Sequence, residues 1–115
     1  MEAELDMTRL AELEELLGRG VSEIAATLIT ELTKAMAGIE AGLADGDLAG
    51  AALAAHAARN SALMLNAQPM LKALGEIEAA ARVRDEALAR DVLTRVRTTW
   101  AALRARLDSE AARGG

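Results

Sequence analysis

The chain has 115 residues, of which 52% are apolar, so it can form one domain with a modest hydrophobic core and is not expected to be disordered. It contains no cysteine, which excludes disulfides, thiolate chemistry and cysteine-based metal sites. The formal net charge is −5 at pH 7 and no basic stripe runs along the sequence, which argues against a nucleic-acid-binding protein.

The composition predicts an all-α fold. Aromatic side chains, which strands favour, are reduced to a single tryptophan, with no phenylalanine and no tyrosine. The chain is rich instead in alanine, leucine, glutamate and arginine, which are the strongest helix formers. We therefore look for helical periodicity along the chain.

The first two helices are predicted before residue 45. A short helix from about Thr8 to Leu17 stops at Gly18-Arg19-Gly20. Ser22 is the predicted N-cap of a long second helix that runs to about Ala44. In both helices apolar residues recur every three or four positions, as a buried helix face requires: Leu10, Leu13, Leu16 and Leu17 in the first, and Ile24, Leu28, Leu32, Met36, Ile39 and Leu43 in the second.

The third helix is predicted from Leu48 to about Leu65, with Asp47 as its N-cap. Its core positions are spaced three or four apart and are unusually small, so a neighbouring helix can approach closely; they are Leu48, Ala51, Ala55, Ala58, Ala62 and Leu65. Asn66 is suited to the left-handed conformation that often ends a helix.

Two more helices complete the predicted fold. The fourth begins near Pro69, and the fifth follows a turn at Arg84-Asp85, with Asp85 as its N-cap. Their expected core residues are Met70 or Leu71, Leu74, Ile77 and Ala81, followed by Leu88, Val92, Val96, Trp100 or Thr99, Leu103 and Leu107.

Short connections favour antiparallel neighbours, so we predict one domain spanning residues 1–115. Its expected architecture is an antiparallel up-down bundle of four long helices with a short additional N-terminal helix. The sequence has no run of about 18 uncharged apolar residues, so no membrane span is expected. An acidic N-terminus does not look like a signal peptide, and we expect a cytoplasmic protein.

His56 is the only histidine of the chain and the main candidate for chemistry. A single histidine on a helix is most often a solvated surface residue. Here, however, it lies about 100° around the helix from Ala55, so it flanks the core stripe. Arg59 follows one turn later on the same side, and a guanidinium there can hold a phosphoryl group carried by the imidazole.

At residues 56–67, HAARNSALMLNA, the sequence resembles the histidine-containing phosphotransfer (HPt) family. The family signature is a histidine, any residue, an apolar residue, lysine, glycine, two small residues and a closing Gly-Ala pair. The turn at residues 44–48, ADGDL, resembles the turn before the family's histidine helix, and residues 74–78, LGEIE, resemble its Leu-Glu segment on the next helix. The likeness extends over nearly the whole chain.

The resemblance implies that His56 accepts a phosphoryl group from the aspartyl phosphate of a receiver domain and passes it on. The expected partners are then a response-regulator receiver domain, a hybrid histidine kinase, or both, with the chain itself a monomer. The divalent metal and the acidic pocket belong to the receiver, so neither cofactor nor metal is expected here, and no kinase activity.

Three substitutions distinguish this chain from the signature, and the mildest is Asn66 in place of the helix-ending glycine, because asparagine also tolerates that conformation. Arg59 replaces lysine and keeps the charge, whereas Asn60 replaces glycine. The Asn60 side chain either obstructs the receiver or donates a compensating hydrogen bond. Arg59, by its charge, and Asn60, by that hydrogen bond, are the residues predicted to orient the phosphoryl group. Ala52, Leu53 and Leu63, which surround His56 on the helix, are the predicted docking residues.

Two alternatives to phosphotransfer remain. One is a degenerate HPt-like module that docks a receiver or kinase without carrying phosphate, because Asn60 has altered the site. The other is a purely structural helical bundle that self-associates through an alanine-rich face. A haem bundle is disfavoured because the chain has no attachment motif and almost no aromatic residues.

Overall fold

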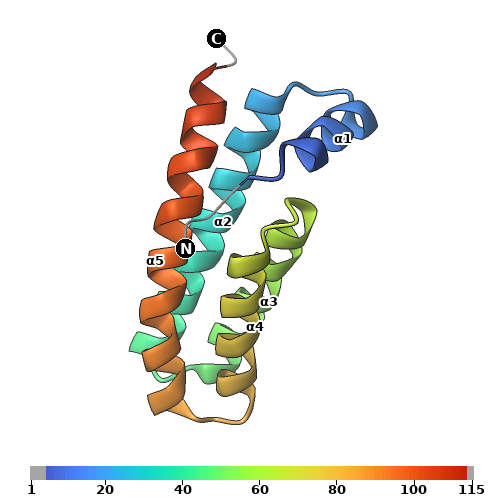
Figure 1. Cartoon of the computed structure of the whole chain (residues 1–115). Coiled ribbons are helices and arrows are strands. Elements are labelled where there is room, and N and C mark those ends of the chain that lie inside the picture. The colour runs from blue at the N-terminus through green and yellow to red at the C-terminus, as the bar shows by residue number, and fades with distance from the viewer. Residues whose placement is uncertain (1–4, 114–115) are drawn as a thin grey trace.

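A computed structural model describes residues 5–113, and this part of the chain is entirely helical. Five helices follow one another with short connections (Figure 1). They are α1 (Met7–Leu17), α2 (Val21–Ala44), α3 (Leu48–Met64), α4 (Gln68–Arg82) and α5 (Glu86–Arg113). The prediction of an all-α protein is confirmed, and no strand occurs between residues 5 and 113.

The helix ends are set by local capping interactions. The Asp47 side chain accepts a hydrogen bond from the Gly50 backbone N–H at 2.9 Å, and that of Asp85 accepts one from Leu88 at 3.1 Å. Asn66 has a positive φ of 53° in the turn after α3. These three predictions are confirmed, because a cap or turn depends only on residues a few positions away. The predicted N-cap Ser22 is wrong, since α2 already begins at Val21 with Gly20 before it.

The four longer helices pack in a closed series of contacts. Helix α2 packs against α3 and α5, and α4 packs against the same two helices. Figure 1 shows these four lying side by side along the length of the molecule, with α1 across one end. The packing is consistent with a helical bundle whose extents are 42 × 26 × 20 Å. No helix in the described part of the chain is both long enough and apolar enough to cross a membrane.

Helix α3 packs closely on α2 because its buried face is made of alanines. Ala51, Ala55, Ala58 and Ala62 are all at most 1% exposed. On the facing helix, Gly42 lies so near that an added Cβ would be 2.8 Å from the Ala51 backbone nitrogen. Small residues on both helices thus bring the backbones together, and the opposite side of α3 is left facing solvent.

Three predicted core leucines lie on the surface instead. Leu16 and Leu17 at the end of α1 are exposed, and only Leu10 and Leu13 of that helix are buried. Because α1 lies across the end of the other helices, only part of its apolar side is covered. Leu88 is also exposed. Both Leu88 and Ala89 are spaced to share a helix face with Val92, at four and three residues before it, and the first turn of α5 buries Ala89.

Candidate functional site

His56 lies near the middle of α3, away from the alanine face. Its neighbour Ala55 is 1% exposed, whereas the His56 side chain is 55% exposed. The rotation of about 100° between successive helical residues separates the two environments. The imidazole is therefore accessible to a second molecule while the backbone that carries it is held in the packed helix.

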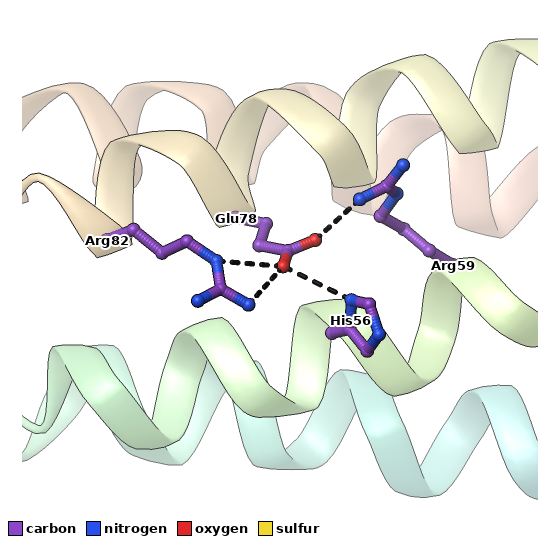
Figure 2. Close-up of polar contacts among 4 residues, drawn as sticks. All are labelled: His56, Arg59, Glu78 and Arg82. Atoms are coloured by element: carbon purple, nitrogen blue, oxygen red, sulfur yellow. Dashed lines mark hydrogen bonds and ion pairs between the residues drawn. The ribbon is translucent and has the colours of Figure 1, made fainter.

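A buried carboxylate on the neighbouring helix is the centre of the site. Glu78 of α4 has a side chain only 6% exposed, and its Oε2 lies 3.2 Å from His56 Nδ1. Two arginines also bind it: Arg59 donates to Oε1 at 2.8 Å, and Arg82 donates to Oε2 through Nε at 2.9 Å and through its terminal nitrogen at 2.6 Å. Figure 2 shows the imidazole of His56 and the guanidinium groups of Arg59 and Arg82 pointing toward the Glu78 carboxylate.

Glu78 is an anion at neutral pH. Desolvation by burial would raise its pKa, but hydrogen bonds from Arg59 and Arg82, with the charges of Arg82 and His56, outweigh it. The pKa of Glu78 therefore lies below its ordinary value of 4.5. A buried carboxylate with this set of donors is compensated, and removing the donors would leave it without partners.

The charge of Glu78 decides which nitrogen of His56 carries the proton. An ionised carboxylate only accepts hydrogen bonds, so the facing Nδ1 must be the donor. In the neutral imidazole, Nε2 is then unprotonated and carries the free lone pair. Nε2 makes no hydrogen bond within residues 5–113, and it lies on the side of the ring away from Glu78 (Figure 2). The site thus presents an oriented nitrogen nucleophile to solvent.

The other predicted site residues of α3 are distributed around His56. Arg59 is half-exposed and turned toward Glu78. Asn60 is exposed, and its side chain forms no hydrogen bond within the part of the chain described. Leu53 and Leu63 are 69% and 61% exposed, so both are available for contact. Ala52 is only 4% exposed, because it lies at the α3–α4 junction beside Ala81 and Arg82. Ala52 is thus largely covered, contrary to the exposed position expected of it, and its docking role stays a prediction.

Glu78 and Arg82 were not predicted as site residues. The segment containing Glu78 carried the family resemblance on the fourth helix, but nothing in the sequence indicates that this side chain reaches His56, 22 residues earlier. Arg82 lies four residues after Glu78, a spacing that predicts an ion pair within one helix. This spacing does not predict that either residue lies near His56. The contact depends on how α3 and α4 pack.

The site is locally cationic on an acidic chain. Two arginines and a histidine surround one carboxylate, whereas the whole chain has a net charge of −5. Such a cluster favours an anionic ligand next to the imidazole. Within residues 5–113 no group of three or more histidine, cysteine, aspartate or glutamate side chains is placed to hold a metal ion.

Comparison with protein-family models, with curated proteins and with solved structures finds no match to this chain.

The ion pairs of the carboxylates predict a loss of stability in acid. The pKa values of Glu78 and Glu40 are both lowered; at Glu40 the main cause is a two-point hydrogen bond from Arg97 at 2.6 and 2.5 Å. A lowered pKa in the folded state means that the unfolded chain binds more protons in acid. The free energy of unfolding should therefore be steady above about pH 5 and fall as the pH drops below about 4.5.

Urea unfolding followed by circular dichroism at pH 7, 5, 4 and 3 measures this loss. Glu40→Gln serves as the matched variant, because it removes one carboxylate with a lowered pKa whose partner is Arg97 of α5 and not a residue of the His56 site. It should show a smaller difference between pH 7 and pH 3 than the wild type. Equal stability of the wild type at pH 5 and pH 3 would contradict the prediction.

Proposed function

We propose that this chain is a histidine phosphotransfer protein of a two-component phosphorelay, with His56 as the phosphoacceptor. In this proposal its helices form an antiparallel up-down four-helix bundle of the HPt type, capped by α1. The observation that carries the proposal is the accessible imidazole whose Nδ1–H is held by the buried Glu78, which leaves Nε2 open. The resemblance of residues 56–67 to the HPt signature supports the same function.

The reaction is a transfer of one phosphoryl group between two proteins. The Nε2 lone pair attacks the phosphorus of an aspartyl phosphate on the receiver, an N–P bond forms, and the P–O bond to the aspartate breaks. The bonding electrons leave with the aspartate as a carboxylate. The ring carries positive charge until its Nδ1 proton is released, and the Glu78 anion 3.2 Å away stabilises that charge. Transfer to a second receiver reverses these steps.

Arg59 and Arg82 have complementary tasks in this scheme. Arg59 uses one terminal nitrogen for Glu78 and its side chain stays half-exposed, so the other terminal nitrogen can orient the phosphoryl oxygens, whereas Nε is buried. Arg82 binds Glu78 through two nitrogens and compensates the buried charge if Arg59 turns to phosphate. Asn60 adds an exposed amide one turn beyond His56, which can donate a hydrogen bond to the same group.

The proposed partners are receiver domains, free or within a hybrid histidine kinase, that meet the chain as a monomer in the cytoplasm. The receiver supplies the divalent cation and the acidic pocket, so the helical chain contributes the nucleophile, its orienting carboxylate and the guanidinium groups. Leu53 and Leu63 are exposed apolar side chains on either side of His56 along its helix, and either of them can supply an apolar contact to the receiver.

A second candidate function is a binding module that docks a receiver or kinase without carrying phosphate. The observation that favours it is Asn60, an exposed side chain one turn from His56 where the HPt signature has glycine. Its carboxamide occupies space that an approaching receiver needs. The imidazole would then remain unmodified even in a complex.

Labelling with a small phosphodonor separates the two functions. Wild-type protein is incubated with phosphoramidate, and the phosphorylated residue is identified by mass spectrometry. The proposal expects one phosphoryl group on His56 that is lost in acid and retained in alkali. A phosphorylated receiver should then transfer its group to the same residue. Labelling by phosphoramidate with receiver binding but no transfer favours the binding module, and no labelling of His56 by either donor contradicts the phosphorelay function.

A further inference from the structure

A groove between α3 and α4 lies next to the His56 site and is not used by the chemistry above. It has a volume of about 390 Å³ and is bounded by Leu48, Ala49, Ala52, Leu53, Ala81, Arg82 and Arg84. The two helices that form its walls lie side by side (Figure 1). Its lining combines small or apolar side chains with two guanidinium groups.

The two arginines of the groove differ in what they bind. Arg82 is paired with Glu78, but Arg84 forms no ion pair within residues 5–113. The nearest acidic residue in sequence, Asp85, is occupied as the cap of α5. Arg84 is exposed and is held at a positive φ of 61° in the turn after α4. The lining of the groove therefore includes a guanidinium with no carboxylate partner among residues 5–113, on a chain whose net charge is −5.

Exposed apolar side chains flank the same groove. Leu53, on the α3 wall, is 69% exposed, and Val83, next to Arg84 in the turn, is 75% exposed. Leu53 and Val83 extend the apolar lining of the groove onto its rim, and a contiguous apolar groove of this kind is a candidate contact surface for a partner. An apolar groove between two packed helices can accept the apolar side of a third helix.

We propose that this groove binds an acidic amphipathic helix of the partner protein, with leucine-like side chains on Leu48, Ala49 and Leu53 and carboxylates toward Arg84. The proposal depends on the proposed function only for the identity of the protein that carries the helix. It also makes docking asymmetric: the partner contacts the Leu53 end of α3 and leaves Leu63, on the other side of His56, outside the interface.

The test uses the whole chain, labelled with nitrogen-15, and a synthetic helical peptide. The peptide has leucines at positions i, i+4, i+7 and i+11 with glutamates between them, and a second peptide has lysine in place of each glutamate. We expect saturable amide shifts centred on residues 48–53 and 81–84 with the acidic peptide only. Shifts centred on Leu63 and Met64, equal binding of the two peptides, or no saturable shift with either would overturn the proposal.

Each binding variant is compared with a control that carries the same chemical change elsewhere on the surface, so that loss of peptide binding is not confused with loss of folding. Arg84→Glu should weaken acidic-peptide binding roughly 5–30-fold, because it removes an attraction and adds a repulsion, and Leu53→Asp should weaken it similarly. Arg106→Glu makes the same change of charge at an exposed position of α5, and Leu16→Asp makes the same apolar-to-acidic change at an exposed leucine of α1; both should bind like the wild type. Equal weakening by a variant and its control would contradict the assignment.

Phosphoramidate labelling of the same samples distinguishes the two proposals, since a small phosphodonor needs no docking surface. Protein that is labelled on His56 but does not bind the acidic peptide refutes the groove alone. Protein that binds the peptide through Arg84 but is labelled on His56 by neither phosphoramidate nor a phosphorylated receiver keeps the groove and refutes the phosphoacceptor.

Discussion

Glu78→Gln is expected to slow the phosphorylation of His56 by roughly 10–100-fold, the usual cost of removing the partner that orients a functional histidine. Glutamine has nearly the same shape, but its amide can donate as well as accept, and it carries no charge. The Nδ1–H tautomer then loses its main support, and the positive charge that develops on the ring loses its counter-ion. The rate of phosphohistidine formation with phosphoramidate, followed by phosphorus NMR, measures the effect.

Two controls separate positioning from a general loss of structure. The nitrogen-15 shifts of the imidazole report the tautomer directly: the wild type should be protonated at Nδ1, and Glu78→Gln should be a mixture of tautomers. His56→Gln should abolish labelling altogether. An unchanged rate with a shifted tautomer would mean that Glu78 has no part in the reaction, and an unchanged tautomer would refute the orienting role itself.

Gly42→Ala is expected to destabilise the protein by about 1–2 kcal/mol, although alanine is the better helix former. The new Cβ would lie 2.8 Å from the Ala51 nitrogen and 2.9 Å from the Asp47 carbonyl oxygen. Both are backbone atoms, so the clash is relieved only if α2 and α3 move apart. That movement loosens the packing of the alanine face, which is already deficient in large side chains.

Gly75→Ala is the matched control, because Gly75 also lies inside a helix. Its added Cβ would meet only Arg59 Nε, at an ordinary contact distance of 3.9 Å. Alanine should therefore stabilise α4 by about 0.5–1 kcal/mol. Urea unfolding of the two variants should give changes of opposite sign. A stabilised Gly42→Ala would show that α2 and α3 are less tightly packed than the structure indicates.

Local features of the sequence accounted for most of the helices. Asp47 and Asp85 were recognised as N-caps and Asn66 as a left-handed turn residue, because each interaction spans only a few positions. Helical periodicity correctly placed the alanine stripe of α3 in the core. It failed for Leu16, Leu17 and Leu88, since periodicity describes which side of a helix is apolar and not how far a neighbouring helix covers it.

The candidate site also has a part that the sequence predicts and a part that depends on how the helices pack. Sequence by itself determined that His56 and Arg59 share a helix face beside the core, because one helix has a known geometry. Only the tertiary structure decided that Glu78 of α4 lies opposite them, that Arg82 shares its carboxylate, and that Ala52 is covered. These contacts depend on the register and separation of two packed helices, which are set by the combined fit of all their side chains and cannot be obtained from the spacing within either helix alone.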